Sequence, residues 1–178
     1  SSLNTGNPEL QYHAGYMLGA MDRIQPAIEF YRKIPKDHPK YKLSRLNLSE
    51  LLTLSGEKAE ALAIAKNIWE AAPDWLAARE CYGLRLLELG HSENAAEILD
   101  TLIVNRNATA RVQDGWHKAM QQTLEKQFAA NQLENAQKTT RRILLYREKD
   151  PMASSYSTRI QNALLEQEKA AREKAQQN

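Results

Sequence analysis

Four histidines and one cysteine are the first side chains to consider for acid–base, nucleophilic or metal chemistry, because the plentiful carboxylates are of the kind that helical proteins usually expose to solvent. His13, His38, His91 and His117 are scattered, and none has an acidic or cysteine partner at the spacing of a metal site. Cys81 has no second cysteine with which to form a disulfide. The sequence contains no glycine-rich phosphate loop, nucleophile elbow or two-histidine zinc helix. We therefore predict a protein that is not an enzyme and that holds no metal or cofactor.

A basic cluster in the C-terminal third is a candidate anion or nucleic-acid site. Arg141, Arg142, Arg147 and Lys149 surround Tyr146. Cations late in a helix also stabilise its negative end, and we favour this interpretation. The formal net charge of +2 is too small to indicate nucleic acid or acidic lipid as a partner.

Small residues recur every 34 residues and indicate the elements that must position any binding side chains. A period of this length is typical of stacked helix–turn–helix units. In each unit a small residue of the first helix precedes an alanine of the second by twelve residues. We expect the two to face each other, so that the helices cross closely. The recurring positions are Gly15, Ser49 and Gly83; Asp22, Gly56 and Gly90; and Ala27, Ala61 and Ala95.

Helix boundaries follow from caps and prolines. Asn7 and Pro8 predict the start of the first helix, because asparagine caps helices and proline suits the first helical position. We expect Pro26 to open the second helix and Pro35 and Pro39 to end it. Three regular units are predicted over residues 8–41, 42–75 and 76–109, preceded by a linker at 1–7.

The fourth unit, residues 110–151, is predicted to be longer. Its turn residue, Asn131, comes seven residues later than the period requires, which is about two helical turns. We expect a long first helix from roughly Thr109 to Ala130 and a second from Leu133 to Arg147. Residues 152–178 are predicted to form a capping helix with one apolar face, followed by a polar end that frays or stays helical.

The repeated residues resemble those of the tetratricopeptide repeat (TPR) family over residues 8–109. The family's tryptophan near the start of each unit is absent, and Gln11, Arg45 and Arg79 stand there. The matching positions are Ala14, Gly15, Leu18, Ala27, Tyr31, Ile34 and Pro39 in the first unit; Leu48, Ser49, Leu52, Gly56, Ala61, Ala65, Ile68 and Pro73 in the second; and Tyr82, Gly83, Leu86, Gly90, Ala95, Leu99 and Leu102 in the third.

The resemblance implies an all-α, right-handed superhelical solenoid of antiparallel helix pairs that binds protein partners on its concave face. The first helix of each pair lines that face. The wall is expected to be aromatic and aliphatic at one end and acidic further along, which suits a peptide with apolar anchors and a basic residue. The alternative to binding is that Tyr12 and Tyr16 are buried in the packing of the repeats, and that Glu50 and Glu80 are simply solvated. The candidate partner-binding residues are Tyr12, Tyr16, Leu46, Glu50, Leu54, Glu80, Leu84 and Glu88.

The predicted function is a non-catalytic scaffold for protein–protein interaction. The alternatives are the soluble TPR part of a bacterial envelope, polysaccharide or pilus secretion machine; a self-associating solenoid; and an RNA-binding helical repeat, which we disfavour. Some TPR proteins hold the acidic tails of chaperones through basic inner residues, and the acidic residues here argue against that role. The start at Ser1, without Met, leads us to expect a fragment of a longer protein. Cytoplasmic and periplasmic locations are both compatible with the sequence.

Overall fold

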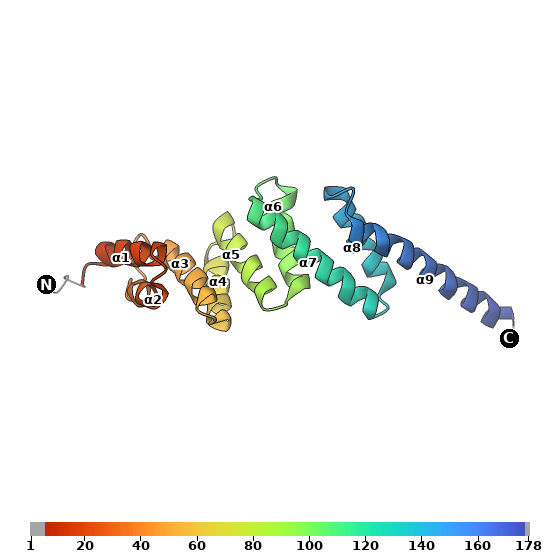
Figure 1. The fold of residues 1–178 in the computed structure, drawn as a ribbon, viewed down its shortest axis with the longest axis horizontal. Helices are drawn as coiled ribbons and strands as arrows, with labels where there is room; N and C mark the ends of the chain where they lie inside the picture. Colours follow the sequence, from red (N-terminus) through yellow and green to blue (C-terminus); the bar gives the residue numbers. More distant parts are fainter. Residues whose placement is uncertain (1–5, 177–178) are drawn as a thin grey trace. The chain divides into compact units, whose positions relative to one another are not determined.

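The computed structural model describes residues 6–176, and this part of the chain forms nine α-helices and no strand (Figure 1). Residues 1–5 of the predicted linker and residues 177–178 of the predicted polar end lie outside the described residues. The helices are α1 (Pro8–Ala20), α2 (Ile24–Arg32), α3 (Tyr41–Leu54), α4 (Lys58–Ala71), α5 (Leu76–Glu88), α6 (Ser92–Val104), α7 (Ala110–Ala129), α8 (Leu133–Tyr146) and α9 (Pro151–Gln176).

The chain divides into two compact units, residues 1–112 and residues 113–178. In the first unit, α1 packs on α2, α3 on α4 and α5 on α6, which gives the three expected helical hairpins (Figure 1). The helix α2 also packs on α3, and α4 packs on α5, while the first helices α1, α3 and α5 contact one another in succession. Because the first helices adjoin, side chains from successive hairpins can meet on one surface.

The first hairpin begins as expected but its second helix does not. The Asn7 side chain accepts a hydrogen bond of 2.9 Å from the Glu9 backbone N–H, and Pro8 is in the first turn of α1. The prediction that Pro26 opens α2 is wrong, because α2 begins at Ile24. A proline is tolerated there since the first four N–H groups of a helix have no partner within it. The first intrahelical bond at this end is donated by Ala27 to the Arg23 carbonyl.

The small residues of the first helices allow close contacts with the second helices. Ala27, Ala61 and Ala95 are completely buried. A Cβ atom placed on Gly15 would lie 3.1 Å from the Tyr31 ring, and one on Gly83 would lie 2.5 Å from Leu99 Cδ2. These glycines therefore make room for a large side chain one helical turn beyond the alanine. In the second hairpin the expected pair does meet: the Ser49 hydroxyl donates to the Ala61 carbonyl at 2.9 Å.

The hairpin turns contain a residue in the left-handed backbone region. Gly56 and Gly90 have φ values of +90° and +79°. Asp22 and Asn131 occupy the corresponding turns with φ values of 56° and 57°. The prediction that Asn131 replaces the turn glycine is therefore confirmed.

The second unit follows the longer plan that the sequence predicts. The helices α7 and α8 end within one residue of the expected bounds. Within this unit, the Thr139 hydroxyl donates to Gln127 Oε1 at 2.7 Å and links α8 to α7. The apolar face of α9 is buried at Ala153 and Ile160, and beyond Leu165 the helix is exposed. None of the described helices is both long enough and apolar enough to span a membrane.

Candidate binding groove on the inner helices

A hollow of about 320 Å³ lies between the first helices of the second and third hairpins, and we call it the inner hollow. Leu46, Leu84 and Ala77 supply its apolar surface. A volume of this size falls at the lower end of the range typical of ligand sites. The lining residues are Leu46, Asn47 and Glu50 of α3; Ala77, Glu80, Cys81, Leu84 and Arg85 of α5; and Arg111.

Arg85 is the central polar residue of the inner hollow, and only 1% of its side chain is exposed. Its guanidinium donates to Glu50 Oε2 at 2.8 Å, to the Thr53 hydroxyl, and to the Ser49 carbonyl at 3.5 Å. Glu88 Oε2 lies 3.2 Å from Nε, although that Nε makes no hydrogen bond within the described part of the chain. A buried guanidinium needs such partners, because an unpaired buried charge costs several kcal/mol. Arg85 therefore ties α5 to α3.

Glu50 is shared between two arginines. Arg111 Nη2 donates to its two carboxylate oxygens at 2.9 and 3.0 Å. Burial lowers the pKa of the Arg111 guanidinium, but the hydrogen bonds to Glu50 together with the negative charges of Glu50, Glu80 and Glu88 outweigh this effect. The pKa therefore lies above its ordinary value. The charges of this cluster compensate one another at the surface of the hollow, and one carboxylate orients both guanidinium groups.

Cys81 is a packed thiol at the side of the hollow. Its Sγ lies 3.5 Å from the Ser49 hydroxyl. Burial raises the pKa of the Cys81 thiol, and this effect exceeds the opposite effect of the hydrogen bond to Ser49. A raised pKa leaves little of the reactive thiolate at neutral pH. The geometry gives Cys81 a packing role.

The structure brings together four of the eight side chains that the sequence nominates for binding. Leu46, Glu50, Glu80 and Leu84 all line the inner hollow. Each comes from the first helix of a hairpin, at the repeat positions next to the small residue or one turn before it. The other four nominated residues, Tyr12, Tyr16, Leu54 and Glu88, do not line this hollow.

The two nominated tyrosines of α1 have different surroundings. Tyr12 is buried in the core, with its ring 5.8 Å from the ring of Tyr31 in an edge-on arrangement and the Lys40 ammonium 4.8 Å from its centroid. Burial raises the pKa of Tyr31 to about 12. Tyr16 is 58% exposed, and Leu54 of the second hairpin is 65% exposed. Substitutions at Tyr12 and Tyr16 therefore test different properties, namely packing and surface recognition.

Arg85 and Arg111 are part of the inner hollow although sequence reasoning did not nominate them. Arg85 occupies the repeat position that Leu51 has in the second unit, and Leu51 is a buried core residue. A charged residue at a core position of the repeat was the available signal. Arg111 begins the irregular fourth unit, where the repeat gives no guide to its direction.

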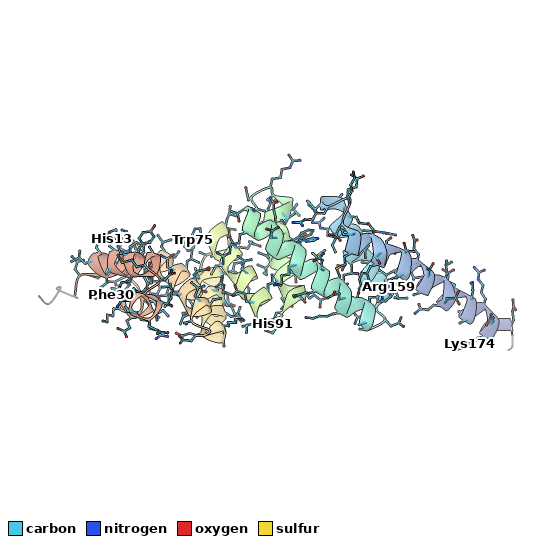
Figure 2. All side chains as sticks on the ribbon, in the orientation of Figure 1. His13, Phe30, Trp75, His91, Arg159 and Lys174 are labelled. Carbon is cyan, nitrogen blue, oxygen red and sulfur yellow. The ribbon has the colours of Figure 1, made fainter. Side chains whose placement is uncertain are left out.

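Three of the four histidines have an acidic side chain nearby in the structure. Glu9 Oε1 is 3.1 Å from His13 Nε2, and Glu9 Oε2 is 3.6 Å from His38 Nε2. In the second unit, His117 Nε2 lies 2.6 Å from Asp150 Oδ2. The sequence could not reveal the pairs of His38 and His117, because their partners lie 29 and 33 residues away along the chain. Within the described residues, however, no three His, Cys, Asp or Glu side chains are grouped to hold a metal ion, and His13 and His91 lie on separate hairpins (Figure 2).

The basic cluster of the C-terminal third is partly engaged in contacts within the second unit. The Arg142 guanidinium lies 5.1 Å from the Tyr146 ring centroid, which is a cation–π distance. Arg147 donates to Asp114 Oδ1 at 3.0 Å. These contacts give two of the four cations a role in holding α8.

Comparison with known proteins identifies the fold. No protein-family model and no curated protein matches the sequence. Solved structures do match, and one is the TPR2B domain of yeast Sti1 in complex with pHsp70, with a TM-score of 0.56 and 21% identity over 65% of this chain and 97% of that one. The chain has a TPR-type fold. It is all-α and built from helical repeats, as the sequence predicts.

Two further solved structures match over more of the chain. A tetratricopeptide repeat protein from Parabacteroides merdae aligns with a TM-score of 0.59 and 17% identity, covering 89% of this chain and 59% of that one. MamA 41-end from Desulfovibrio magneticus RS-1 aligns with a TM-score of 0.60 and 14% identity, covering 94% and 99%. At these identities the likeness concerns the fold alone.

Proposed function

We propose that the chain is a non-catalytic scaffold whose inner hollow binds a segment of a partner protein. The observation that carries the proposal is the juxtaposition, on two adjacent inner helices, of apolar walls and fixed charges. Leu46 and Leu84 offer a place for one apolar side chain, and Glu80 offers a negative charge beside it. Grooves that recognise peptides combine these two elements, anchors for affinity and polar groups for orientation.

The charges of the inner hollow favour a ligand with a basic residue next to its apolar anchor. Glu50 is already shared by Arg85 and Arg111. Glu80 also lines the hollow, and within the described part of the chain it forms no ion pair. A basic group of the ligand would therefore find its counter-charge at Glu80. An acidic ligand would have to displace Glu50 from both arginines.

This charge pattern separates the chain from one of the similar structures. The Sti1 TPR2B domain was solved with pHsp70 bound, which supports a protein partner in general terms. For the present chain we infer a different ligand, because its two inner arginines are neutralised by Glu50. The inferred specificity is for apolar and basic residues in succession.

A peptide selection on the whole chain tests this proposal. A random dodecapeptide library would be selected for binding, and the selected peptides would be titrated by fluorescence anisotropy. Ala77→Arg places a large side chain in the hollow, whereas Ala63→Arg is the matched control at an exposed position of α4. We expect Ala77→Arg to weaken binding about tenfold or more, and Ala63→Arg to leave it unchanged.

Two results would overturn the proposal. One is equal affinity of the selected peptides for both arginine variants at equal melting temperature. The other is selection of peptides without a basic residue whose binding is indifferent to Glu80→Lys. Both results report on binding and not on fold stability, provided that Ala77→Arg and Ala63→Arg have the same melting temperature.

Self-association is a second candidate that a specific observation favours. The helix α1 and the residue after it carry large apolar side chains that are more than half exposed, namely Leu10, Tyr16, Met17 and Met21. Helical repeats bury such faces by stacking on a neighbouring unit. A second copy of this chain could supply that unit. Light scattering over a hundredfold concentration range, with Met17→Glu as the variant, would show a mass that rises with concentration only in the native chain.

A further inference from the structure

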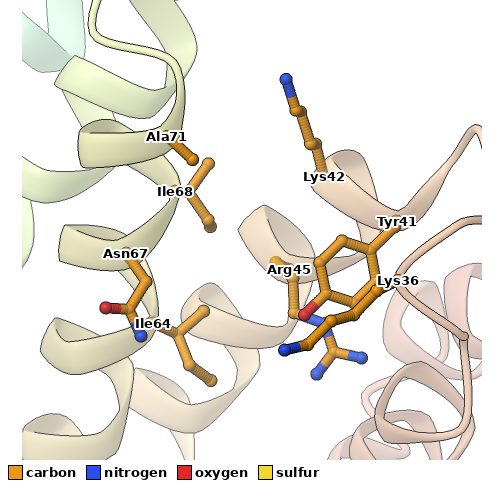
Figure 3. A pocket seen from close by; sticks show the side chains of 8 residues that line it. All are labelled: Lys36, Tyr41, Lys42, Arg45, Ile64, Asn67, Ile68 and Ala71. Atoms are coloured by element: carbon orange, nitrogen blue, oxygen red, sulfur yellow. The ribbon is translucent and has the colours of Figure 1, made fainter.

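A second and larger hollow lies on another side of α3, between α3 and α4, and we call it the Tyr41 pocket. Its volume is about 500 Å³, which is within the range of ligand sites. Tyr41 and Arg45 face Ile64 and Asn67 across the opening (Figure 3). The lining residues are Lys36, Tyr41, Lys42, Arg45, Ile64, Asn67, Ile68 and Ala71.

The charged side chains of the Tyr41 pocket are all positive. Lys36, Lys42 and Arg45 contribute to its lining, and no carboxylate does. Within the described residues, neither lysine forms an ion pair. Three neighbouring cations without a counter-charge create a positive potential that attracts an anion. The inner hollow, by contrast, contains its own carboxylates.

Arg45 is fixed at the base of the Tyr41 pocket by neutral partners. Its Nη2 donates to the carbonyls of Tyr31 and Ile34, at 3.0 and 3.2 Å. Its guanidinium lies 4.7 Å from the Tyr41 ring centroid, and its Nε is buried without a hydrogen-bond partner among the described residues. Burial lowers the pKa of the Arg45 guanidinium. The charge is thus desolvated, held in place and not neutralised by the protein.

The start of α3 adds to the positive potential. Tyr41 and Lys42 are the first two residues of this helix of 14 residues, and Lys40 before them makes no side-chain capping bond. A helix N-terminus carries a partial positive charge and favours anions. Side-chain charge and helix dipole therefore act in the same direction at this end of the pocket.

The opposite wall of the Tyr41 pocket is aliphatic. Ile64, Ile68 and Ala71 come from one face of α4, with the Asn67 amide beside them. A ligand that fills the pocket must therefore present an apolar group a few ångströms from its anionic group. The pocket has one aromatic ring, that of Tyr41, and Arg45 stacks on it. It thus lacks the series of aromatic platforms on which nucleic-acid bases stack.

We propose that the Tyr41 pocket binds a short segment of a partner protein in which a carboxylate adjoins an aliphatic side chain. The carboxylate meets Lys36, Lys42 and Arg45, and the aliphatic group rests on Ile64 and Ile68. Asn67 is placed to bond the peptide backbone of the segment. This site does not depend on the inner hollow, and it has the opposite charge preference.

Two matched peptides test the proposal on the whole chain. One is an acetylated and amidated hexapeptide that alternates glutamate and leucine, and the other replaces each glutamate with glutamine. We expect the acidic peptide to bind about tenfold more tightly or better, because hydrogen bonds between charged groups are stronger than those to a neutral amide. In NMR spectra it should shift the methyl signals of Ile64 and Ile68 and the side-chain amide of Asn67.

A pair of double variants with the same change in net charge provides the control. Lys36→Gln with Lys42→Gln should weaken binding of the acidic peptide about tenfold, whereas Lys58→Gln with Lys66→Gln, on the exposed surface of α4, should change it less than about twofold. Equal affinity for the two peptides, equal affinity of the two double variants, or shifts confined to Leu46 and Leu84 of the inner hollow would each overturn the proposal. Tighter binding of a single-stranded RNA oligonucleotide than of the acidic peptide would overturn it in favour of nucleic acid.

Discussion

The inner hollow and the Tyr41 pocket share helix α3 but treat charge in opposite ways. In the inner hollow, Arg85 and Arg111 meet the carboxylate of Glu50. In the Tyr41 pocket, Arg45 meets only backbone carbonyls, and two lysines stand beside it without a counter-charge. The helix α3 therefore has paired charges on the side of the inner hollow and unpaired positive charges on the side of the Tyr41 pocket.

This difference separates the requirements of folding from those of recognition. A compensated cluster holds helices together, and a ligand gains little by replacing bonds that the protein already makes. An uncompensated cation attracts a ligand from solution, with a strength that depends on salt. We expect substitutions in the inner cluster to act mainly on stability, and substitutions of the lysines in the Tyr41 pocket to act mainly on binding.

The largest effect is expected for Arg85→Ala, which removes the centre of the inner cluster. It should lower the free energy of unfolding by about 3 kcal/mol, because it deletes a buried side chain together with its bonds to Glu50, Thr53 and Ser49. Urea denaturation measures this loss. Arg111→Ala removes the same charge from a side chain that is 54% exposed and should cost less than about 1 kcal/mol. Similar losses for the two variants would contradict the central role of Arg85.

A smaller effect, about 1–3 kcal/mol, is expected for Ala61→Leu in the hairpin that borders both hollows. Ala61 is completely buried, and its carbonyl accepts the hydrogen bond from Ser49, so a larger side chain must push α4 away from α3. Thermal unfolding followed by circular dichroism provides the measurement. Ala63→Leu on the exposed face of α4 is the control and should be neutral within about 0.5 kcal/mol. If Ala61→Leu is equally neutral, the close contact in this hairpin does not limit stability.

For Arg45→Ala we expect a loss of about 1–2 kcal/mol, less than for Arg85→Ala. The substitution deletes two hydrogen bonds to carbonyls that follow or end α2, but it leaves no unpaired carboxylate behind. Hydrogen exchange of the amides of α2 should increase together with the loss of global stability. Lys42→Ala, at an exposed position of the same pocket, should leave both unchanged. If Arg45→Ala lowered the free energy of unfolding as much as Arg85→Ala does, the proposed difference between the two arginine clusters would be wrong.

The smallest effect concerns reactivity. Because burial raises the pKa of the Cys81 thiol, less thiolate is present at a given pH than for a free cysteine. Alkylation by iodoacetamide at pH 7.5 should be about tenfold slower than that of a free cysteine, and its rate should rise as the pH increases past the ordinary thiol value of about 8.5. Mass spectrometry of the intact chain measures the rate. A rate equal to that of the urea-unfolded chain would show that the wall of the inner hollow is open at Cys81.

Much of the fold could be predicted from the sequence because the repeat positions are fixed by close contact. The period located the turns at Gly56 and Gly90, and the late Asn131 gave the length of α7. Pro26 misled the prediction, because a proline is compatible with several positions in the first turn of a helix. The large side chains that lie nearest to Gly15 and Gly83 were not predicted, since spacing along the chain does not specify which side chain fills the gap that a glycine leaves.

The candidate sites were harder to predict, because they depend on side-chain direction. The repeat places Leu46, Glu50, Glu80 and Leu84 on one surface, and these are the nominated residues that meet in the inner hollow. Arg45 occupies the position where the TPR pattern has a tryptophan. Its guanidinium donates to the Ile34 carbonyl just after the end of α2, which a tryptophan pattern does not predict. Nothing in the one-dimensional pattern says that two arginines, forty residues apart, would end in such different electrostatic surroundings.

The residues in the left-handed backbone region make the hairpin turns differ in stability. Glycine adopts this backbone region freely, but a residue with a Cβ atom is strained there by about 1 kcal/mol. Gly56 and Gly90 avoid that strain, whereas Asp22 and Asn131 bear it. On warming, the hairpin turns at Asp22 and Asn131 should therefore loosen before those at Gly56 and Gly90. Asp22 belongs to the first compact unit and Asn131 to the second, so each unit contains one such strained hairpin turn.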